Sequence, residues 1–171
     1  MKILHVGMDF NVEHMAAVCA RLIDGKLYVF KEYHDFLDTP ELINAIGFDF
    51  PDDKLICYPD ASGVKRGSTD AGTSDIALLR KAGFSIRARS KNPFIKDRIA
   101  SVNNAFNREK LFIDTERCPE ITEALEQQIY TPNGQPDKKS GLDHITDAVG
   151  YLVYYLMPVR ELKPQTRGVV H

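Results

Sequence analysis

The sequence predicts an α/β domain with one mixed central sheet: three antiparallel strands come first, parallel strands follow, and helices lie on both faces. Two observations predict this fold class. Residues 2–11, 14–23 and 27–33 are consecutive apolar runs separated by short turns, as in hairpin strands. After residue 39, short apolar runs alternate with stretches of helical periodicity, which is typical of strands joined through helices.

Turn and cap residues place the first elements. Asp24 and Gly25 separate the second and third runs, and this pair tolerates the positive φ values of a tight hairpin. Thr39 and Pro40 have the order of a helix start, a cap residue followed by proline. We expect this helix to end at Gly47.

The second half alternates strand and helix. Residues 54–58 form a short apolar strand, and Ser74 is expected to cap a helix that stops at Gly83. Residues 85–89 alternate between apolar and basic, which predicts a strand with one basic face. The remaining expected elements are a helix starting at Asn92-Pro93, a brief strand at 111–113, an amphipathic helix at 118–130, a polar turn-rich segment at 131–141 and a last helix at 142–157.

Composition indicates one compact domain, which we assign to residues 1–157, followed by a loosely held tail at 158–171. The 171 residues are 43% hydrophobic, enough for a single core. There is no apolar run of membrane-spanning length and no signal-peptide pattern, so we expect no membrane contact and no export. The three cysteines are odd in number, widely spaced and without a CxxC pair, so neither a zinc knuckle nor a disulfide framework is indicated.

Three aspartates stand at the ends or edges of apolar elements. Asp9 ends the first strand, Asp60 follows the strand at 54–58, and Asp147 lies one turn inside a largely apolar helix. A carboxylate beside a core needs a compensating cation, and a metal ion is a common one. The alternative for Asp9 is an ordinary strand-end aspartate that accepts hydrogen bonds from nearby backbone N–H groups.

The last helix carries further candidate ligands. Asp143 and Asp147 are four residues apart and His144 and Asp147 three apart, so all three side chains can approach one patch. Two alternatives remain open. Asp143 could complete a capping box begun by Ser140, and His144 could be an ordinary packing histidine.

These acids, in this order on these elements, resemble the RNase H-like nucleases. The quoted stretches are Gly-Met-Asp-Phe-Asn at 7–11, Tyr-Pro-Asp-Ala-Ser-Gly at 58–63 and Leu-Asp-His-Ile-Thr-Asp-Ala-Val-Gly-Tyr at 142–151. They resemble the C-terminal nuclease domain of the viral terminase large subunit, whose last motif is Asp-His-x-x-Asp-Ala. The resemblance implies that the strands ending at Asp9 and Asp60 are neighbours at the centre of the sheet.

The resemblance implies two-metal cleavage of DNA with two Mg²⁺ or Mn²⁺ ions. Asp9, Asp60 and Asp147 would be the catalytic acids. Asp9 would bridge both ions, Asp60 would bind one, and Asp147 with His144 the other, with Asp143 as a further candidate ligand.

The implied partners are double-stranded DNA, a terminase ATPase domain, the small terminase subunit and the portal. The implied location is the host cytoplasm, and we expect a monomer in isolation. The ATPase must come from elsewhere in the polypeptide or from a partner, because these residues contain no GxxxxGK[ST] motif.

A basic cluster at residues 80–98 is the candidate DNA surface, although the net charge is only −2. The residues expected to contact phosphates are Arg87, Arg89, Lys91, Lys96 and Arg98. The alternative is a solvated charged face. Because no row of aromatic residues or recognition-helix pattern accompanies the cluster, we expect cleavage with little sequence specificity.

Three other functions compete with this one. Another RNase H-like nuclease, such as a junction resolvase or a ribonuclease acting on RNA/DNA hybrids, would use the same acids. A non-catalytic DNA-binding or assembly module would use them only as caps. An actin-like nucleotide-binding domain is disfavoured, because it needs more length and a second phosphate-binding hairpin.

Overall fold

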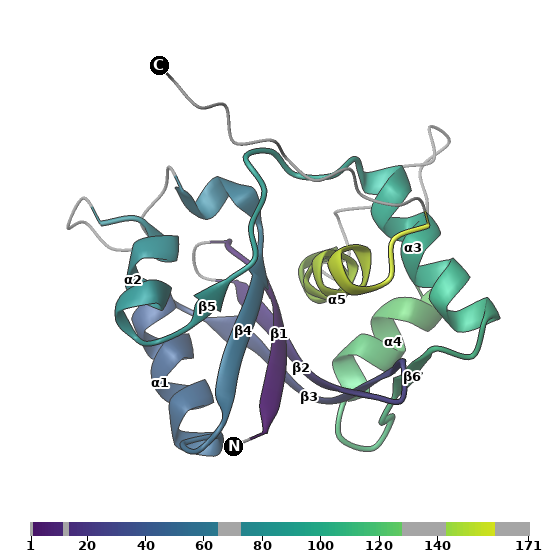
Figure 1. Cartoon of the computed structure of the whole chain (residues 1–171), viewed down its shortest axis with the longest axis horizontal. Helices are drawn as coiled ribbons and strands as arrows, with labels where there is room; N and C mark the ends of the chain where they lie inside the picture. Colours follow the sequence, from purple (N-terminus) through teal and green to yellow (C-terminus); the bar gives the residue numbers. More distant parts are fainter. Residues whose placement is uncertain (1, 12–13, 65–72, 128–142, 160–171) are drawn as a thin grey trace.

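The computed structural model describes residues 2–11, 14–64, 73–127 and 143–159. The elements in order are β1 (Ile3–Asp9), β2 (Met15–Ile23), β3 (Lys26–Phe36), α1 (Thr39–Asp49), β4 (Lys54–Pro59), η1 (Ala61–Val64), α2 (Asp75–Lys81), β5 (Ser85–Ile86), α3 (Ile95–Asn107), β6 (Leu111–Ile113), α4 (Pro119–Gln127) and α5 (Asp143–Leu156). The strands form one sheet in the order β5-β4-β1-β2-β3-β6. Helices α1 and α2 cover one face, and α3, α4 and α5 lie on the other (Figure 1).

The strand directions confirm the predicted fold class. β1 pairs antiparallel with β2, and β2 with β3. β4, β5 and β6 all join their neighbours in parallel. The turn between β2 and β3 is the predicted one: Asp24 and Gly25 have φ values of 49° and 74°, the conformation that a tight hairpin requires.

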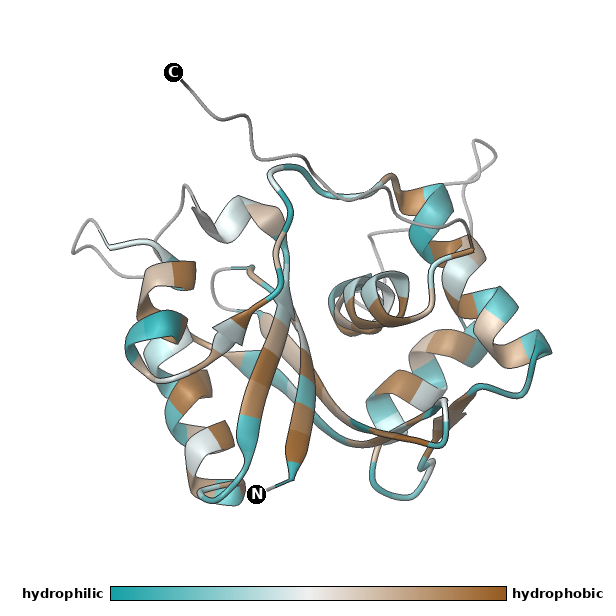
Figure 2. Cartoon of the chain, viewed as in Figure 1, coloured by the Kyte–Doolittle hydropathy of each residue, from teal (hydrophilic) through white to brown (hydrophobic). Residues whose placement is uncertain are grey.

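The central strands are buried on both faces, which explains their nearly continuous apolar sequences. In β1, Leu4, Val6 and Met8 pack into the core under α1 and α2. The intervening residues face α5, because side chains alternate along a strand. Figure 2 shows hydrophobic residues along β1 and β4 in the middle of the molecule. This alternation places Asp9 on the same face as Gly7, toward α5.

The ends of α1 differ from the sequence expectation. The N-cap is Asp38, whose carboxylate accepts a hydrogen bond from the Glu41 backbone N–H at 2.9 Å. Thr39 is instead the first helical residue, and its hydroxyl is buried. The helix also runs past Gly47 to Asp49, because Gly47 does not adopt the positive φ that would end it. For α2, the predicted Ser74 cap and the stop at Gly83, with φ of 92°, are confirmed.

The segment between β5 and α3 is the second difference. The predicted strand at 85–89 is only two residues long, and the last sheet hydrogen bond runs from Arg87 N–H to the Cys57 carbonyl at 2.8 Å. The chain then leaves the sheet, and α3 begins at Ile95 rather than at Asn92. Asn92 therefore lies in an irregular segment, and its side chain contacts the end of β4.

Several expectations fall outside the described residues. These are the 131–141 segment, the Ser140 cap, the 160–171 part of the tail and the 65–72 part of the loop after β4. All three cysteines are buried free thiols, as expected. No helix among the described residues is long and apolar enough to cross a membrane.

Candidate metal centre

Two acids lie at the same edge of the sheet because β1 and β4 are parallel neighbours. Asp9 is the last residue of β1, and Asp60 directly follows β4. The Asp60 N–H donates to the Met8 carbonyl at 2.9 Å, which fixes the two strand ends beside each other. Both residues are buried, with exposed fractions of 7% and 8%. The sequence-based expectation that these two strands are neighbours is confirmed.

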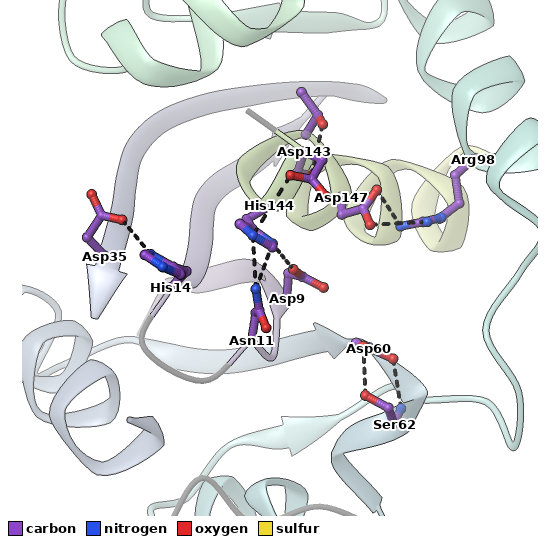
Figure 3. A network of polar contacts seen from close by, with 11 residues as sticks. Asp9, Asn11, His14, Asp35, Asp60, Ser62, Arg98, Asp143, His144 and Asp147 are labelled. Atoms are coloured by element: carbon purple, nitrogen blue, oxygen red, sulfur yellow. Dashed lines mark hydrogen bonds and ion pairs between the residues drawn. The ribbon is translucent and has the colours of Figure 1, made fainter. Parts of the chain in front are cut away.

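Gly7 allows α5 to approach this edge. A Cβ added at Gly7 would lie 2.2 Å from the Ala148 carbonyl oxygen and 2.8 Å from the Leu152 Cβ, so no larger residue fits there. α5 therefore packs directly on β1. This close packing brings His144 and Asp147, in the first turns of α5, to the strand end that carries Asp9 (Figure 3).

His144 contacts Asp9. Its Nδ1 lies 3.1 Å from the Asp9 Oδ2, and Asn11 Nδ2 donates to its Nε2 at 2.9 Å. Asp143 is more distant, at 3.8 Å from Nε2, and the His14 ring stacks parallel to the His144 ring. The hydrogen bond to Asp9 raises the pKa of His144, and burial of the ring opposes that rise. His144 is therefore part of the acidic cluster, as the sequence spacing predicted.

Asp147 forms an ion pair with a buried arginine. Arg98 Nη1 lies 2.9 Å from Asp147 Oδ1, and Nη2 donates to Oδ2 at 3.3 Å. The guanidinium group also lies over the Tyr151 ring, 4.3 Å from its centroid. Burial raises the pKa of Asp147 to about 6, the charge of Arg98 opposes this, and the charge of Asp9 adds to it.

Asp60 is held by donors from two segments. Its Oδ1 accepts from the Ser62 N–H at 2.7 Å, and its Oδ2 accepts from the Ser62 hydroxyl at 2.8 Å. Asn92 Nδ2 also donates to Oδ1, while Asn92 Oδ1 accepts from the Ala61 N–H at 2.7 Å. In Figure 3, Asp60 stands apart from the group formed by Asp9, His144 and Asp147.

The acids influence one another across the cluster. Burial raises the pKa of Asp9, the His144 hydrogen bond opposes the rise, and the charge of Asp60 adds to it. Each of the three catalytic candidates has its own polar partner: His144 for Asp9, Ser62 and Asn92 for Asp60, and Arg98 for Asp147. Within the part of the chain that the structure describes, no three histidine, cysteine or acidic side chains are grouped closely enough to hold a metal ion.

The donor set nevertheless suits a hard divalent cation. Carboxylate oxygens are the ligands that Mg²⁺ and Mn²⁺ prefer, and an imidazole is also acceptable to Mn²⁺. Buried carboxylates whose pKa is raised are unfavourable as bare anions, and a bound cation would relieve that cost. The chemistry of the residues therefore fits a metal, and the side chains would have to turn toward one another to share it.

The predicted DNA-binding residues are in different environments. Arg87, Lys91 and Lys96 are exposed. Arg89 is half-buried, with its guanidinium 5.9 and 5.8 Å from the ring centroids of Tyr154 and Tyr155. Arg98 departs from the expectation of an exposed basic face: it is 5% exposed, because it packs between α3 and α5 and pairs with Asp147.

Sequence reasoning did not assign three of the polar residues to this cluster. Asn11 lies two positions after Asp9, and this spacing is the feature of the sequence that could have placed it in the cluster. Arg98 interrupts the apolar positions of α3, and a charge in such a stripe needs a buried partner. No feature of the sequence near Asn92 indicates its contacts, because its partners Ala61 and Asp60 are 31 and 32 residues away in the chain.

Comparison with known proteins identifies relatives in sequence and in structure. A family model described as the terminase RNase H-like domain matches residues 6–156. No curated protein sequence matches the chain significantly.

Solved structures with a similar fold include three phage large terminases or their nuclease domains. The large terminase of a thermophilic bacteriophage is 20% identical, with a TM-score of 0.72 over 90% of this chain and 40% of that chain. The P22 large terminase nuclease domain is 16% identical, with a TM-score of 0.66 over 91% and 83%. The bacteriophage SPP1 large terminase nuclease domain with bound Mn is 20% identical, with a TM-score of 0.57 over 91% and 87%. The chain thus spans about two fifths of the thermophilic phage protein.

Proposed function

Since the chain belongs to the terminase RNase H-like domain family, we propose that it is a divalent-metal-dependent endonuclease. It would cut double-stranded DNA, with little sequence specificity, during viral genome packaging. The observation that carries the proposal is the contact of Asp9 with His144 at the edge where β1 and β4 end, with Asp147 near enough for its charge and that of Asp9 to interact. Acids whose pKa is raised by burial, and further by the charge of a neighbouring acid, are characteristic of functional sites, because folding alone gains nothing from them.

The residues have distinct roles in this proposal. The charge of Asp9 interacts with those of both Asp60 and Asp147, so Asp9 would contact both ions. Asp60 would hold one ion, and Asp147 with His144 the other. Asp143 is a further candidate ligand, at 3.8 Å from His144. A bound pair of Mg²⁺ or Mn²⁺ ions supplies Lewis acidity to the attacking water and to the leaving oxygen of the phosphodiester. The SPP1 relative was solved with bound Mn, which supports a divalent ion.

DNA would approach the edge where β1 and β4 end by way of the basic cluster at residues 80–98. Arg87, Lys91 and Lys96 are exposed there and would contact phosphates, with Arg89 contributing from its place over two tyrosine rings. The family context adds a terminase ATPase domain, the small terminase subunit and the portal as partners. It also implies activity in the host cytoplasm, with the isolated domain monomeric.

Plasmid cleavage tests the proposal. We expect the purified protein to nick and linearise supercoiled plasmid in Mn²⁺ or Mg²⁺ but not in chelator. Asp9→Asn and Asp147→Asn should abolish cleavage, because each removes a metal-binding carboxylate. The matched control is Asp52→Asn, which changes an exposed turn acid and should retain activity.

Substrate choice separates the related nucleases. Linear duplex, four-way junction and RNA/DNA hybrid would be compared under the same conditions, and we expect the duplex to be cut at least as fast as the other two. Full activity in chelator or in Asp9→Asn would refute the assignment.

A further inference from the structure

We propose that Asn92 and Arg98 are positioning residues for the metal centre, so that the 92–98 segment holds two of its three acids. Asn92 contacts Asp60, and Arg98 contacts Asp147. The inference rests on the proposed function, because it assigns these residues a role in metal binding. Neither residue is itself a metal ligand in this proposal.

Asn92 fixes Asp60 through both ends of one amide group. Its Nδ2 donates to the Asp60 carboxylate, and its Oδ1 accepts from the neighbouring Ala61 N–H at 2.7 Å. An amide bonded at both ends has one orientation, so the donor aimed at Asp60 cannot rotate away. Asn92 is itself exposed, so these contacts orient Asp60 without filling the core. Its truncation should therefore leave the fold intact.

Arg98 fixes Asp147 by a two-point contact. Its two terminal nitrogens lie 2.9 and 3.3 Å from the two carboxylate oxygens. The guanidinium is held in turn by the Tyr151 ring, and the side-chain stem lies near Gly150, where an added Cβ would be 3.4 Å from Arg98 Cβ. Arg98 thus holds the Asp147 carboxylate through one hydrogen bond from Nη2 and the close ionic contact of Nη1, and the packed guanidinium keeps both contacts in place.

The two contacts together connect elements that are distant in sequence. Asp60 follows β4 and Asp147 lies on α5, yet one short segment reaches both. A carboxylate offers about four acceptor sites, so each acid can keep its partner and still bind a cation. Partners of this kind around a metal site typically account for a 10- to 100-fold difference in metal affinity, which is roughly the effect expected here.

Mn²⁺ binding in the absence of DNA tests the proposal. Titration calorimetry would measure the affinity of the wild type, Asn92→Ala and Arg98→Met, with thermal unfolding as the check on folding. We expect each variant to bind Mn²⁺ roughly 10- to 100-fold more weakly. Matched controls are Asn107→Ala and Arg108→Met, which change an exposed amide and an exposed arginine at the far end of α3. Both controls should bind as the wild type does.

Two further comparisons keep the test decisive. Arg98→Lys retains the charge and loses the two-point geometry, so it should also bind Mn²⁺ more weakly. In an Asp60→Asn background, Asn92→Ala should cause no additional loss while Arg98→Met still does, because each residue acts through its own acid. If Asn92 and Arg98 only supported the fold, replacing them would lower the melting temperature, but the effect of Asn92→Ala on Mn²⁺ binding would not depend on Asp60.

The outcomes distinguish the two proposals. If folded Asn92→Ala and Arg98→Lys bind Mn²⁺ within about twofold of the wild type, a margin well under the loss expected of such partners, the positioning role is overturned. If the wild type itself binds no Mn²⁺, the proposed nuclease function fails instead.

Discussion

Asp9 shows how a single residue is placed at a cost to folding. It is buried, and that burial raises its pKa, so keeping its carboxylate ionised in the folded chain costs free energy. Its contact with His144 offsets part of this cost. A residue kept in this state is better explained by a ligand than by packing.

The change Asp9→Asn tests that cost. In chelator at pH 7.5, we expect the variant to melt at the same temperature as the wild type or higher, because an uncharged amide is cheaper to bury. Adding Mn²⁺ should raise the melting temperature of the wild type and leave Asp9→Asn unchanged. Ligand at 100 times its Kd stabilises a protein by about 2.7 kcal/mol, which a thermal scan detects readily.

The control for this comparison is Asp24→Asn. Asp24 is exposed in the hairpin turn, and asparagine tolerates its φ of 49°. It should respond to Mn²⁺ as the wild type does. A marked fall in the melting temperature of metal-free Asp9→Asn would show that Asp9 is a structural residue.

At the residue scale, the sequence pointed to the candidate acids more readily than to the side chains that contact them. Asp9, Asp60 and Asp147 stood out because each interrupts or ends an apolar run. Arg98 was assigned to a surface because neighbouring residues are basic, although its place in the apolar stripe of α3 indicated burial. The Asn92 contact depends on the path of the chain after β5, which no local pattern encodes.

At the scale of elements, the site depends on the packing of α5 against β1. The sequence predicted both elements correctly, and the resemblance to the RNase H-like nucleases implied that β1 and β4 are neighbours, which the structure confirms. It missed the early end of β5, because the alternation of residues 85–89 continues after the sheet hydrogen bonds stop. Local periodicity reports which face is apolar, but not where the chain leaves the sheet.

Gly7→Ala tests the contact between β1 and α5. The added methyl group would overlap the Ala148 carbonyl, so α5 must shift away from the strand. We expect a loss of about 3 kcal/mol in the free energy of unfolding, at the upper end for overpacking, measured by urea denaturation. Because the shift moves His144 and Asp147 away from Asp9, cleavage and Mn²⁺ binding should fall as well.

Gly47→Ala is the matched control for this change. Gly47 lies inside α1, and an added Cβ meets nothing within 4 Å. Alanine should therefore stabilise the helix by up to about 1 kcal/mol and leave Mn²⁺ binding unaltered. If Gly7→Ala were as stable as the wild type, the close approach of α5 to β1 would not be needed.

At the scale of the whole molecule, the distribution of charge matters more than its sum. The net charge of −2 gives no general attraction to DNA. The exposed cations Arg87, Lys91 and Lys96 lie in the chain segment whose Asn92 contacts Asp60, close to the acidic edge. Duplex DNA held by these cations would have its phosphates near the three acids.

Neutralising these cations tests that arrangement. We expect the triple variant Arg87→Gln, Lys91→Gln and Lys96→Gln to bind a duplex oligonucleotide more weakly in chelator. Because each phosphate contact releases counterions, the slope of log affinity against log salt concentration should become shallower by about 2 to 3. Fluorescence anisotropy over a range of salt concentrations would measure it.

A triple variant with the same charge change controls for net charge. Lys2, Lys26 and Arg108 are exposed at the opposite end of the sheet, where β1 begins and the β2–β3 turn lies. Replacing these three with glutamine should change the affinity little, since the Debye length of about 8 Å at physiological salt confines their influence. Equal losses in the two variants would mean that DNA senses only the overall charge. No loss in either variant would place the DNA-binding surface away from the acidic edge, and the proposed nuclease activity would then require other cations to hold DNA near the acids.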